Sequence, residues 1–203
     1  GFVGKQVLKS LAKEDVSIRV ITRGTQDHFF AQYKNISEVI QTNNLFTEST
    51  IWYEEVCQDV DIIIHVAWYA EPGKYLESPL NLECLAGTLN FAKSACKQGI
   101  KKFVGVGTCF EYDLTNSSPL DINAPLNPQF LYSIAKVNAF LLLSKYFKNE
   151  NIDFLWTRIF YLYGEDEDER RLVAVLRKKL PLGEPVDLTS GTQIRDFMDV
   201  KIA

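Results

Sequence analysis

Tyr132 and Lys136 are the residues whose types and spacing are best suited to moving a proton. They lie four positions apart in a segment with helical periodicity, so we expect both side chains on one face of a helix. A free tyrosine titrates near pH 10, and a neighbouring positive charge favours the phenolate and lowers that pKa. Lowering the pKa to about 7 requires roughly 4 kcal/mol, at about 1.36 kcal/mol per unit. The pair therefore predicts a general acid and base, although the same spacing is also common between surface residues.

Thr108 adds a hydroxyl group at a position that suits ligand chemistry. It directly follows the apolar segment 103–107, which has the pattern of a buried strand. Ligands of open α/β sheets bind at the carboxyl ends of the strands. A hydroxyl there can hydrogen-bond a substrate oxygen that gains or loses a proton. The alternative role for Thr108 is that of a turn or helix-capping hydroxyl.

A glycine-rich turn, Gly1-Phe2-Val3-Gly4, stands directly before a segment with helical spacing. Backbone N–H groups at such a helix start can approach a diphosphate, although a turn of this kind is common by itself. Arg23 follows the β-branched segment 17–22, where an NAD-binding protein often presents a carboxylate to the ribose. An arginine there suits the 2′-phosphate of NADP, or is a solvent-facing residue at a strand end. Turn, helix and strand together predict a dinucleotide-binding unit.

The elements that must position these residues alternate between two periodicities. Strand-like segments are found at 17–22, 61–67, 103–107 and 152–159, and helical segments at 7–11, 82–97, 132–147 and 172–180. This alternation predicts an α/β fold with a doubly wound parallel sheet of the Rossmann type. We expect residues 1–164 to form an NAD(P)-binding domain that lacks its first strand and is thus N-terminally truncated. Residues 165–203 should begin a small C-terminal substrate-binding lobe, and the acidic run 165–169 is interpreted as a solvated loop.

The composition narrows the classes of partner. The 203 residues carry a formal net charge of -4 without a long basic run, which argues against nucleic-acid binding and a polybasic membrane patch. No apolar stretch reaches the roughly 18–20 residues of a membrane helix. The four cysteines include no C-x-x-C pair and there are two histidines, so we expect no metal site. The sequence favours a reduced, cytoplasmic protein.

The ordered set of motifs resembles the extended short-chain dehydrogenase/reductase family, the NAD-dependent epimerase/dehydratase proteins that act on nucleotide sugars. The resemblance covers essentially the whole chain and is specific for the family rather than for one substrate. The residues that carry it are Gly1-Phe2-Val3-Gly4, the segment 61–67, Gly87-Thr88-Leu89-Asn90, Thr108 with Tyr112, Tyr132 with Lys136, Arg158 through Tyr163-Gly164, and Arg195-Asp196-Phe197.

This resemblance implies roles for individual residues. Tyr132 would be the general acid and base, Lys136 would hold the nicotinamide ribose and tune Tyr132, and Thr108 would bind the reacting oxygen. Tyr112 and Arg195 would contact the substrate, the arginine through its phosphates, unless Arg195 forms an exposed salt bridge with Asp196 or Asp199. The residues implied for the NAD or NADP site are Gly1, Phe2, Val3, Gly4, Arg23, Asn44, Leu45, Ala67, Tyr132 and Lys136, of which Asn44 stands where the family often has aspartate.

The expected reaction is hydride transfer at a sugar carbon of a nucleotide-diphosphate hexose. Cys109 and Phe110 follow Thr108 where 4,6-dehydratases have Asp-Glu, and neither side chain can serve as the acid or base of water elimination. Dehydration is therefore disfavoured. Reduction of a 4-keto-6-deoxy sugar is favoured because Arg23 suits NADP, and 4-epimerisation is the alternative. A non-catalytic dinucleotide sensor is the rival from another class. A homodimer through the helix 132–147 is compatible with its apolar run 139–143, which equally fits core packing.

Overall fold

The computed structural model describes residues 1–24, 27–115 and 119–203. Its helices are α1 (Phe2–Leu11), α2 (Asp27–Phe30), α3 (Thr50–Val56), α4 (Leu80–Lys97), α5 (Leu131–Asn149) and α6 (Leu172–Lys179), with 3-10 turns η1 (Leu45–Thr47), η2 (Cys109–Glu111) and η3 (Leu180–Leu182). Its strands are β1 (Ile18–Thr22), β2 (Ile36–Gln41), β3 (Ile62–His65), β4 (Lys102–Thr108), β5 (Asp153–Ile159), β6 (Tyr161–Tyr163) and β7 (Phe197–Asp199).

The strands pair in parallel, which confirms the predicted α/β, Rossmann-like class. The largest sheet has the order β3-β4-β5, with His65 beside Gly105 and Thr108 beside Ile159. Strands β1 and β2 form a second parallel pair, and β6 and β7 a third. Among the described residues these three groups are not joined by backbone hydrogen bonds.

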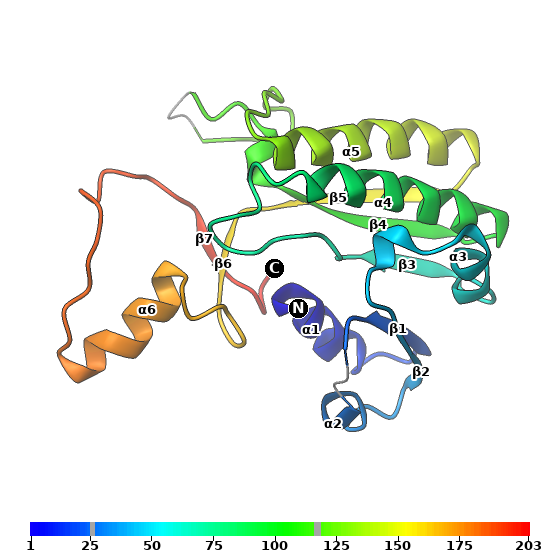
Figure 1. Ribbon diagram of the computed structural model, residues 1–203, viewed down its shortest axis with the longest axis horizontal. Coiled ribbons are helices and arrows are strands. Elements are labelled where there is room, and N and C mark those ends of the chain that lie inside the picture. The colour runs from blue at the N-terminus through cyan, green and yellow to red at the C-terminus, as the bar shows by residue number, and fades with distance from the viewer. Residues whose placement is uncertain (25–26, 116–118) are drawn as a thin grey trace.

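The main core lies between the β3-β4-β5 sheet and helices α4 and α5. These helices lie side by side on one face of the sheet, with α1 on the other side (Figure 1). The residues buried in this core include Ile63, Phe91, Phe103, Leu143 and Phe147. A smaller cluster formed by Leu8, Ile18 and Phe30 joins α1 to β1 and α2.

The apolar run 139–143 of α5 is divided between the buried core and the protein surface. Ala139 and Leu143 are buried in the core, whereas Leu141 and Leu142 remain about half exposed. Their spacing on the helix explains this division, because residues four apart share a face and those between them point elsewhere.

The predicted boundary at residue 164 is crossed by hydrogen bonds. Strand β6 precedes it and pairs with β7, which follows it. The acidic run is exposed at residues 165, 166 and 169 and partly buried at 167 and 168. Its first residues also contact α1: Lys9 Nζ lies 2.9 Å from Glu165 Oε1, and Lys5 Nζ lies 3.5 Å from Asp166 Oδ1. Exposed ion pairs of this kind stabilise a fold by at most about 1 kcal/mol. The division into two domains stays a prediction.

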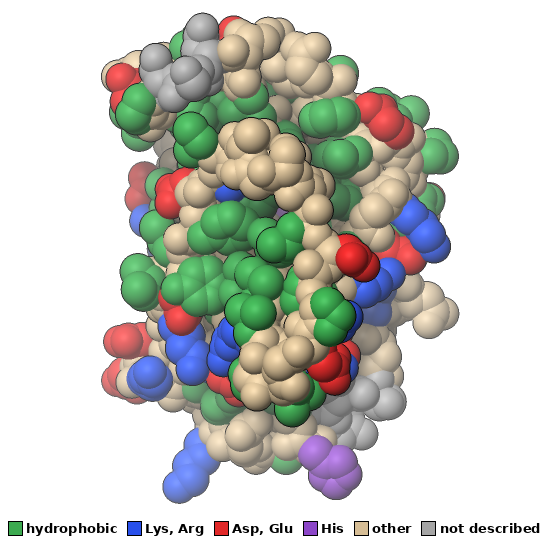
Figure 2. Space-filling model, turned by 90° about the vertical axis from the view of Figure 1, so that its left-hand side faces the viewer, with side chains coloured by type: hydrophobic (Ala, Val, Ile, Leu, Met, Phe, Trp, Pro, Cys, Tyr) green, Lys and Arg blue, Asp and Glu red, His purple; other side chains and the backbone are tan. Residues whose placement is uncertain are grey.

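Large hydrophobic side chains remain exposed in the C-terminal segment. Figure 2 shows hydrophobic side chains gathered on the face of the molecule to which this segment belongs. Those of residues 172–203 that are exposed are Leu172, Leu180, Leu182, Leu188, Ile194, Phe197, Met198 and Ile202. No helix in the described part of the chain is long and apolar enough to cross a membrane.

Candidate active site

Thr108 is the last residue of β4, and its side chain serves two purposes. Its hydroxyl accepts a hydrogen bond from the backbone N–H of Phe110 (3.4 Å) and so caps η2. The same side chain also acts on Tyr132, whose pKa it lowers. Thr108 is buried at the carboxyl end of the sheet, the position that the sequence predicted. The capping and ligand-facing interpretations are therefore compatible rather than alternatives.

Tyr132 lies in the first turn of α5, among aromatic side chains. Its backbone N–H donates to Leu76 O at 2.9 Å, which fixes the start of the helix against the segment after β3. The rings of Tyr75 and Tyr132 meet edge to face with centroids 4.9 Å apart, and the Trp68 ring lies 6.5 Å away. Burial raises the pKa of Tyr132 above its ordinary value, and the side chain of Thr108 acts in the opposite direction.

Lys136 is buried one helical turn after Tyr132, with 3% of its surface exposed. Its ammonium group donates a 2.6 Å hydrogen bond to Val106 O and lies 3.8 Å from the centre of the Trp68 ring. Burial lowers the pKa of Lys136 to about 7, and the negative charge of Glu111 opposes this shift. An amine with this pKa is about half protonated at neutral pH.

The expected lowering of the pKa of Tyr132 by Lys136 is not found in this structure. The amine of Lys136 bonds to Val106 O, and it carries only part of a charge near pH 7. The loss of hydration on burial therefore decides the pKa of the phenol. Near pH 7 the phenol of Tyr132 is therefore neutral and the amine of Lys136 is partly protonated. In this state the phenol can donate a proton but cannot accept one.

The glycine-rich turn forms the start of α1. Gly1 is the N-cap residue, Phe2 and Val3 open the helix, and its first turn contains no acidic residue. A Cβ atom added to Gly1 or Gly4 would meet no other atom within 4 Å, so a ligand can approach the backbone closely there. Open backbone N–H groups at the positive end of a helix fit the diphosphate of a dinucleotide.

The remaining cofactor candidates differ in how accessible they are. Arg23 and Ala67 are exposed at the carboxyl ends of β1 and β3. The side chain of Asn44 is engaged internally, since it accepts from Phe46 N (3.1 Å) and donates to Glu83 Oε1 (2.7 Å). Leu45 is buried in the main core. Burial raises the pKa of the Cys84 thiol, and the charges of Lys136 and Arg23 act in the opposite direction.

The two residues predicted to bind substrate, Tyr112 and Arg195, contact side chains other than Tyr132. Tyr112 is buried, and its ring centre lies 5.1 Å from the guanidinium carbon of Arg158. Arg195 is exposed, with its guanidinium carbon 5.5 Å from the centre of the Tyr161 ring. Within the described ranges, Arg195 makes no ion pair with Asp196 or Asp199.

Glu111 is buried behind Thr108 and forms a group with the partly buried Trp156 and Arg158, whose connection to the site sequence reasoning missed. Two signals pointed to it. Glu111 follows Thr108 by three positions, which is the spacing of a capping box. Gly105 and Gly107 interrupt a strand, which often marks the close approach of another group. His65, by contrast, is buried and hydrogen-bonded to Thr88 (3.0 Å), and burial lowers its pKa to about 3.

Among the described residues, no three His, Cys, Asp or Glu side chains are grouped so that they could hold a metal ion. What the arrangement offers is a threonine hydroxyl at the carboxyl edge of a parallel sheet, a tyrosine whose pKa it lowers, and a buried lysine one helical turn after the tyrosine. Such a set can bind an oxygen atom and exchange a proton with it.

Comparison with known proteins gives consistent matches. The NAD dependent epimerase/dehydratase family matches residues 1–201. Over 212 residues the chain is 26% identical to dTDP-6-deoxy-L-talose 4-dehydrogenase (NAD(+)) of Aggregatibacter actinomycetemcomitans, covering 99% of this chain and 73% of that protein. It is 24% identical to a putative UDP-glucose 4-epimerase of Methanocaldococcus jannaschii, covering 98% of this chain and 67% of that protein.

A solved structure of a UDP-N-acetylglucosamine 4-epimerase from Methanobrevibacter ruminantium superposes with a TM-score of 0.81 at 22% identity. The match covers 99% of this chain and 66% of that one. UDP-glucose 4-epimerase of Thermus thermophilus, solved with NAD, gives a TM-score of 0.79 at 21% identity and covers 99% of this chain and 68% of that one. The present chain thus spans about two thirds of the length of these structures, and the likeness concerns the fold.

Proposed function

We propose that this chain, which belongs to the NAD-dependent epimerase/dehydratase family, forms the cofactor-binding part of an oxidoreductase that acts on a nucleotide-diphosphate sugar. The reaction we favour is reduction of a 4-keto-6-deoxyhexose. The observation that carries the proposal is the placement of three side chains: Thr108 is buried at the end of β4, and Tyr132 and the buried Lys136 lie one turn apart on α5, both beside the Trp68 ring. These groups lie at the strand ends where ligands of this fold class bind.

Each of the three side chains has a distinct task in this proposal. Thr108 orients the carbonyl oxygen of the sugar by a hydrogen bond. Tyr132 gives its hydroxyl proton to that oxygen as it becomes an alcohol, which suits a phenol whose pKa is raised by burial. Lys136 in its ammonium form then stabilises the phenolate that remains. Because its pKa is about 7, a substantial fraction of Lys136 is protonated near neutral pH.

The start of α1 and Arg23 are the groups we propose for the phosphates and ribose of NAD or NADP. The open approach to Gly1 and Gly4 supports this assignment, as does the exposed position of Arg23 at the end of β1. When bound, the nicotinamide supplies or accepts the hydride. Ala67 is exposed after β3 and would line the same cleft. Asn44 and Leu45 would contact the cofactor mainly through their backbone, because their side chains are engaged within the protein.

The choice of C4 as the reacting carbon is supported by the relatives. The dehydrogenase from Aggregatibacter is named for oxidation at C4 of a 6-deoxy sugar nucleotide, which is chemically the reverse of the reduction proposed here. A 4-epimerase is the second candidate, because the Methanocaldococcus relative is named as a putative UDP-glucose 4-epimerase. Both reactions use the same three side chains, and they differ in whether the cofactor is consumed.

The experiment that separates these functions offers the protein two kinds of substrate. With a dTDP-4-keto-6-deoxyhexose and NADPH or NADH, a reductase consumes the reduced cofactor and forms the 4-hydroxy sugar. With UDP-glucose and NAD, an epimerase forms UDP-galactose without net change in the cofactor. Cofactor binding without turnover of either substrate class would instead indicate a dinucleotide-binding protein that is not a catalyst, and would contradict the proposal.

A further inference from the structure

We propose that Glu111 is a positioning residue of the Thr108, Tyr132 and Lys136 site, which it holds from within the protein by binding the backbone of Thr108 and by placing a negative charge on the Trp156 indole that the ammonium group of Lys136 also adjoins. The inference rests on the proposed function, in which Thr108 orients the reacting oxygen. Glu111 is completely buried and does not reach the open side of the site. It would therefore act only through its neighbours.

The carboxylate of Glu111 is bound by three N–H donors. Its Oε1 accepts from the backbone N–H of Thr108 at 2.8 Å and from Trp156 Nε1 at 3.1 Å. Its Oε2 accepts from Arg158 Nε at 2.6 Å, and Trp156 Nε1 lies 3.2 Å from the same oxygen. A buried carboxylate is costly unless it is paired and hydrogen-bonded. Each of these donors comes from the strand that Thr108 ends or from the strand beside it.

The β4 strand is built to admit this arrangement. A Cβ atom on Gly107 would collide with both Glu111 Oε1 and Trp156 Nε1, and one on Gly105 would collide with the Trp156 ring. Glycine within a strand weakens it, because it has no side chain to pack and more conformational freedom to lose. The two glycines are therefore explained by the indole and the carboxylate that lie across the strand.

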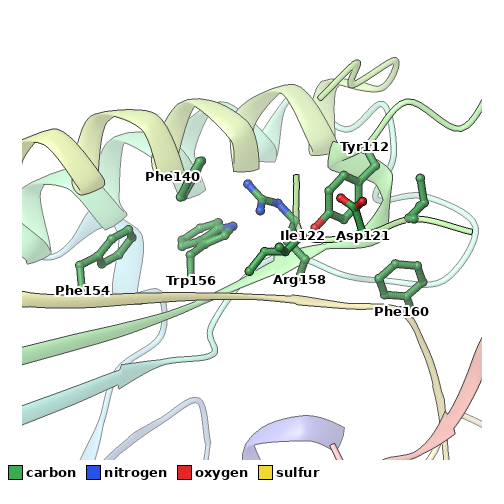
Figure 3. A pocket seen from close by; sticks show the side chains of 9 residues that line it. Tyr112, Asp121, Ile122, Phe140, Phe154, Trp156, Arg158 and Phe160 are labelled. Carbon is green, nitrogen blue, oxygen red and sulfur yellow. The ribbon is translucent and has the colours of Figure 1, made fainter. Parts of the chain in front are cut away.

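Arg158 is itself held in place, so the ion pair has a fixed geometry. Its guanidinium carbon lies 4.5 Å from the ring centre of Phe140 on α5 and 5.1 Å from that of Tyr112. Figure 3 shows Arg158 and Trp156 directed from β5 toward α5, with Phe140 above them. The side chains of Arg158, Trp156 and Phe140 also border a cavity of about 520 Å³. A planar guanidinium stacked between rings cannot be replaced by lysine without loss.

Among the described titratable groups that interact with Lys136, Glu111 is the one that supplies a negative charge near pH 7. His65 on β3 is neutral, because burial lowers its pKa to about 3. Burial also raises the pKa of Cys84 on α4 and of Tyr132 on α5, so both are neutral near pH 7. Glu111 favours the ammonium form of Lys136 against the effect of burial. One carboxylate thus orders the backbone beneath the threonine hydroxyl and favours the charged form of the lysine.

The test compares Glu111→Gln with Glu111→Asp in the purified protein. The indole N–H resonance of Trp68, assigned with a Trp68→Phe variant, reports the protonation of Lys136 because the ammonium group lies against that ring. In Glu111→Gln we expect the midpoint of this titration to move to lower pH by about half a unit or more. We also expect kcat to fall at least about tenfold, with KM changed less than about threefold, as for a group that acts on the transition state.

Glu111→Asp keeps the charge but shortens the reach to Thr108. It should preserve the Lys136 titration and lower kcat, and this variant decides the matter if Glu111→Gln does not fold. The control is Thr157→Val on the same strand, which removes a hydroxyl bonded to Gly105 O and leaves the carboxylate and its three donors in place. It should leave the Trp68 titration unchanged.

The inference is overturned if Glu111→Gln leaves the titration and kcat as they are in the native protein, or if Glu111→Asp has native kcat. Failure of the proposed function is a separate result. In that case no substrate turns over in any variant, whereas the Trp68 titration still reports whether Glu111 controls Lys136.

Discussion

The ammonium group of Lys136 lies 3.8 Å from the centre of the Trp68 ring. Trp68 is fixed in turn by a 2.8 Å hydrogen bond from its indole to Asn81 Oδ1. A desolvated contact between a cation and an aromatic face stabilises the charged form by about 2 kcal/mol. We therefore include the tryptophan in the proposed proton-handling site, to which the motifs in the sequence assigned Thr108, Tyr132 and Lys136.

Replacing Trp68 by leucine should shift the pH dependence of turnover. Without the aromatic face the ammonium form of Lys136 loses stabilisation, so its pKa falls further below the value of about 7 in the native protein. Activity that requires the ammonium form should then decline at lower pH on the alkaline side of the profile. Trp52→Leu is the control, because Trp52 packs beside Tyr53 in α3. An unshifted profile in Trp68→Leu would show that the contact has no influence on Lys136.

Conformational stability should depend on pH through Lys136. Burial lowers the pKa of this residue from the ordinary 10.5 to about 7, so the unfolded chain binds more protons than the native one between these values. Stability contributed by this residue therefore increases as the pH rises from 7 toward 10. In urea unfolding at pH 7 and pH 9, the native protein should gain on the order of 1–3 kcal/mol relative to Lys136→Met over this interval. Equal pH dependence in the two proteins would mean that the folded lysine titrates normally.

Thr108→Val should remove activity while leaving cofactor binding in place. Valine has nearly the shape of threonine but no hydroxyl group, so the reacting oxygen loses its hydrogen bond and Tyr132 loses its partner. We expect kcat to fall about 100-fold or more. The matched control is Thr157→Val on the neighbouring strand, where the hydroxyl donates to Gly105 O. If both variants lose activity to the same extent, the effect is structural and Thr108 has no special role.

Gly105→Ala should destabilise the fold through one identifiable contact. The added methyl group collides with the six-membered ring of Trp156, and overpacking of this kind costs about 1–3 kcal/mol. In a Trp156→Leu background the same substitution should cost less than about 1 kcal/mol. Urea unfolding of the four proteins measures the coupling. If the two substitutions change the free energy of unfolding additively, the added methyl group does not collide with Trp156.

Periodicity predicted the elements with strong patterns and missed the others for physical reasons. The helix that carries Tyr132 and Lys136 and the strand that ends at Thr108 were both recognisable, because their apolar residues recur at helical spacing or form a continuous run. Strand β2 was missed because Ser37 and Glu38 stand next to each other and interrupt its alternation. Strands β6 and β7 are three residues each and depend on pairing with one another, which no local pattern encodes.

For the candidate site, the sequence indicated where the residues lie in the fold, but it did not indicate which of them are ionised. Spacing on a helix predicted that Tyr132 and Lys136 share one environment. It did not reveal how deeply the two side chains are buried, and the loss of hydration on burial is the largest cause of both pKa shifts. The carboxylate of Glu111 lies beneath Thr108, and it has room there because β4 carries glycines where Trp156 crosses it. Such contacts arise from the pairing of β4 with β5 across 52 residues of sequence, as between Gly105 and Thr157.

The most direct test of the account is the turnover of Tyr132→Phe with a dTDP-4-keto-6-deoxyhexose and reduced cofactor, measured beside cofactor affinity. The phenylalanine ring keeps the packing against Tyr75 and lacks the proton. We predict that kcat falls at least about 100-fold with cofactor affinity within about threefold of native, whereas Tyr75→Phe stays near native in both. Native turnover in Tyr132→Phe would contradict the assignment of the phenol as the proton donor.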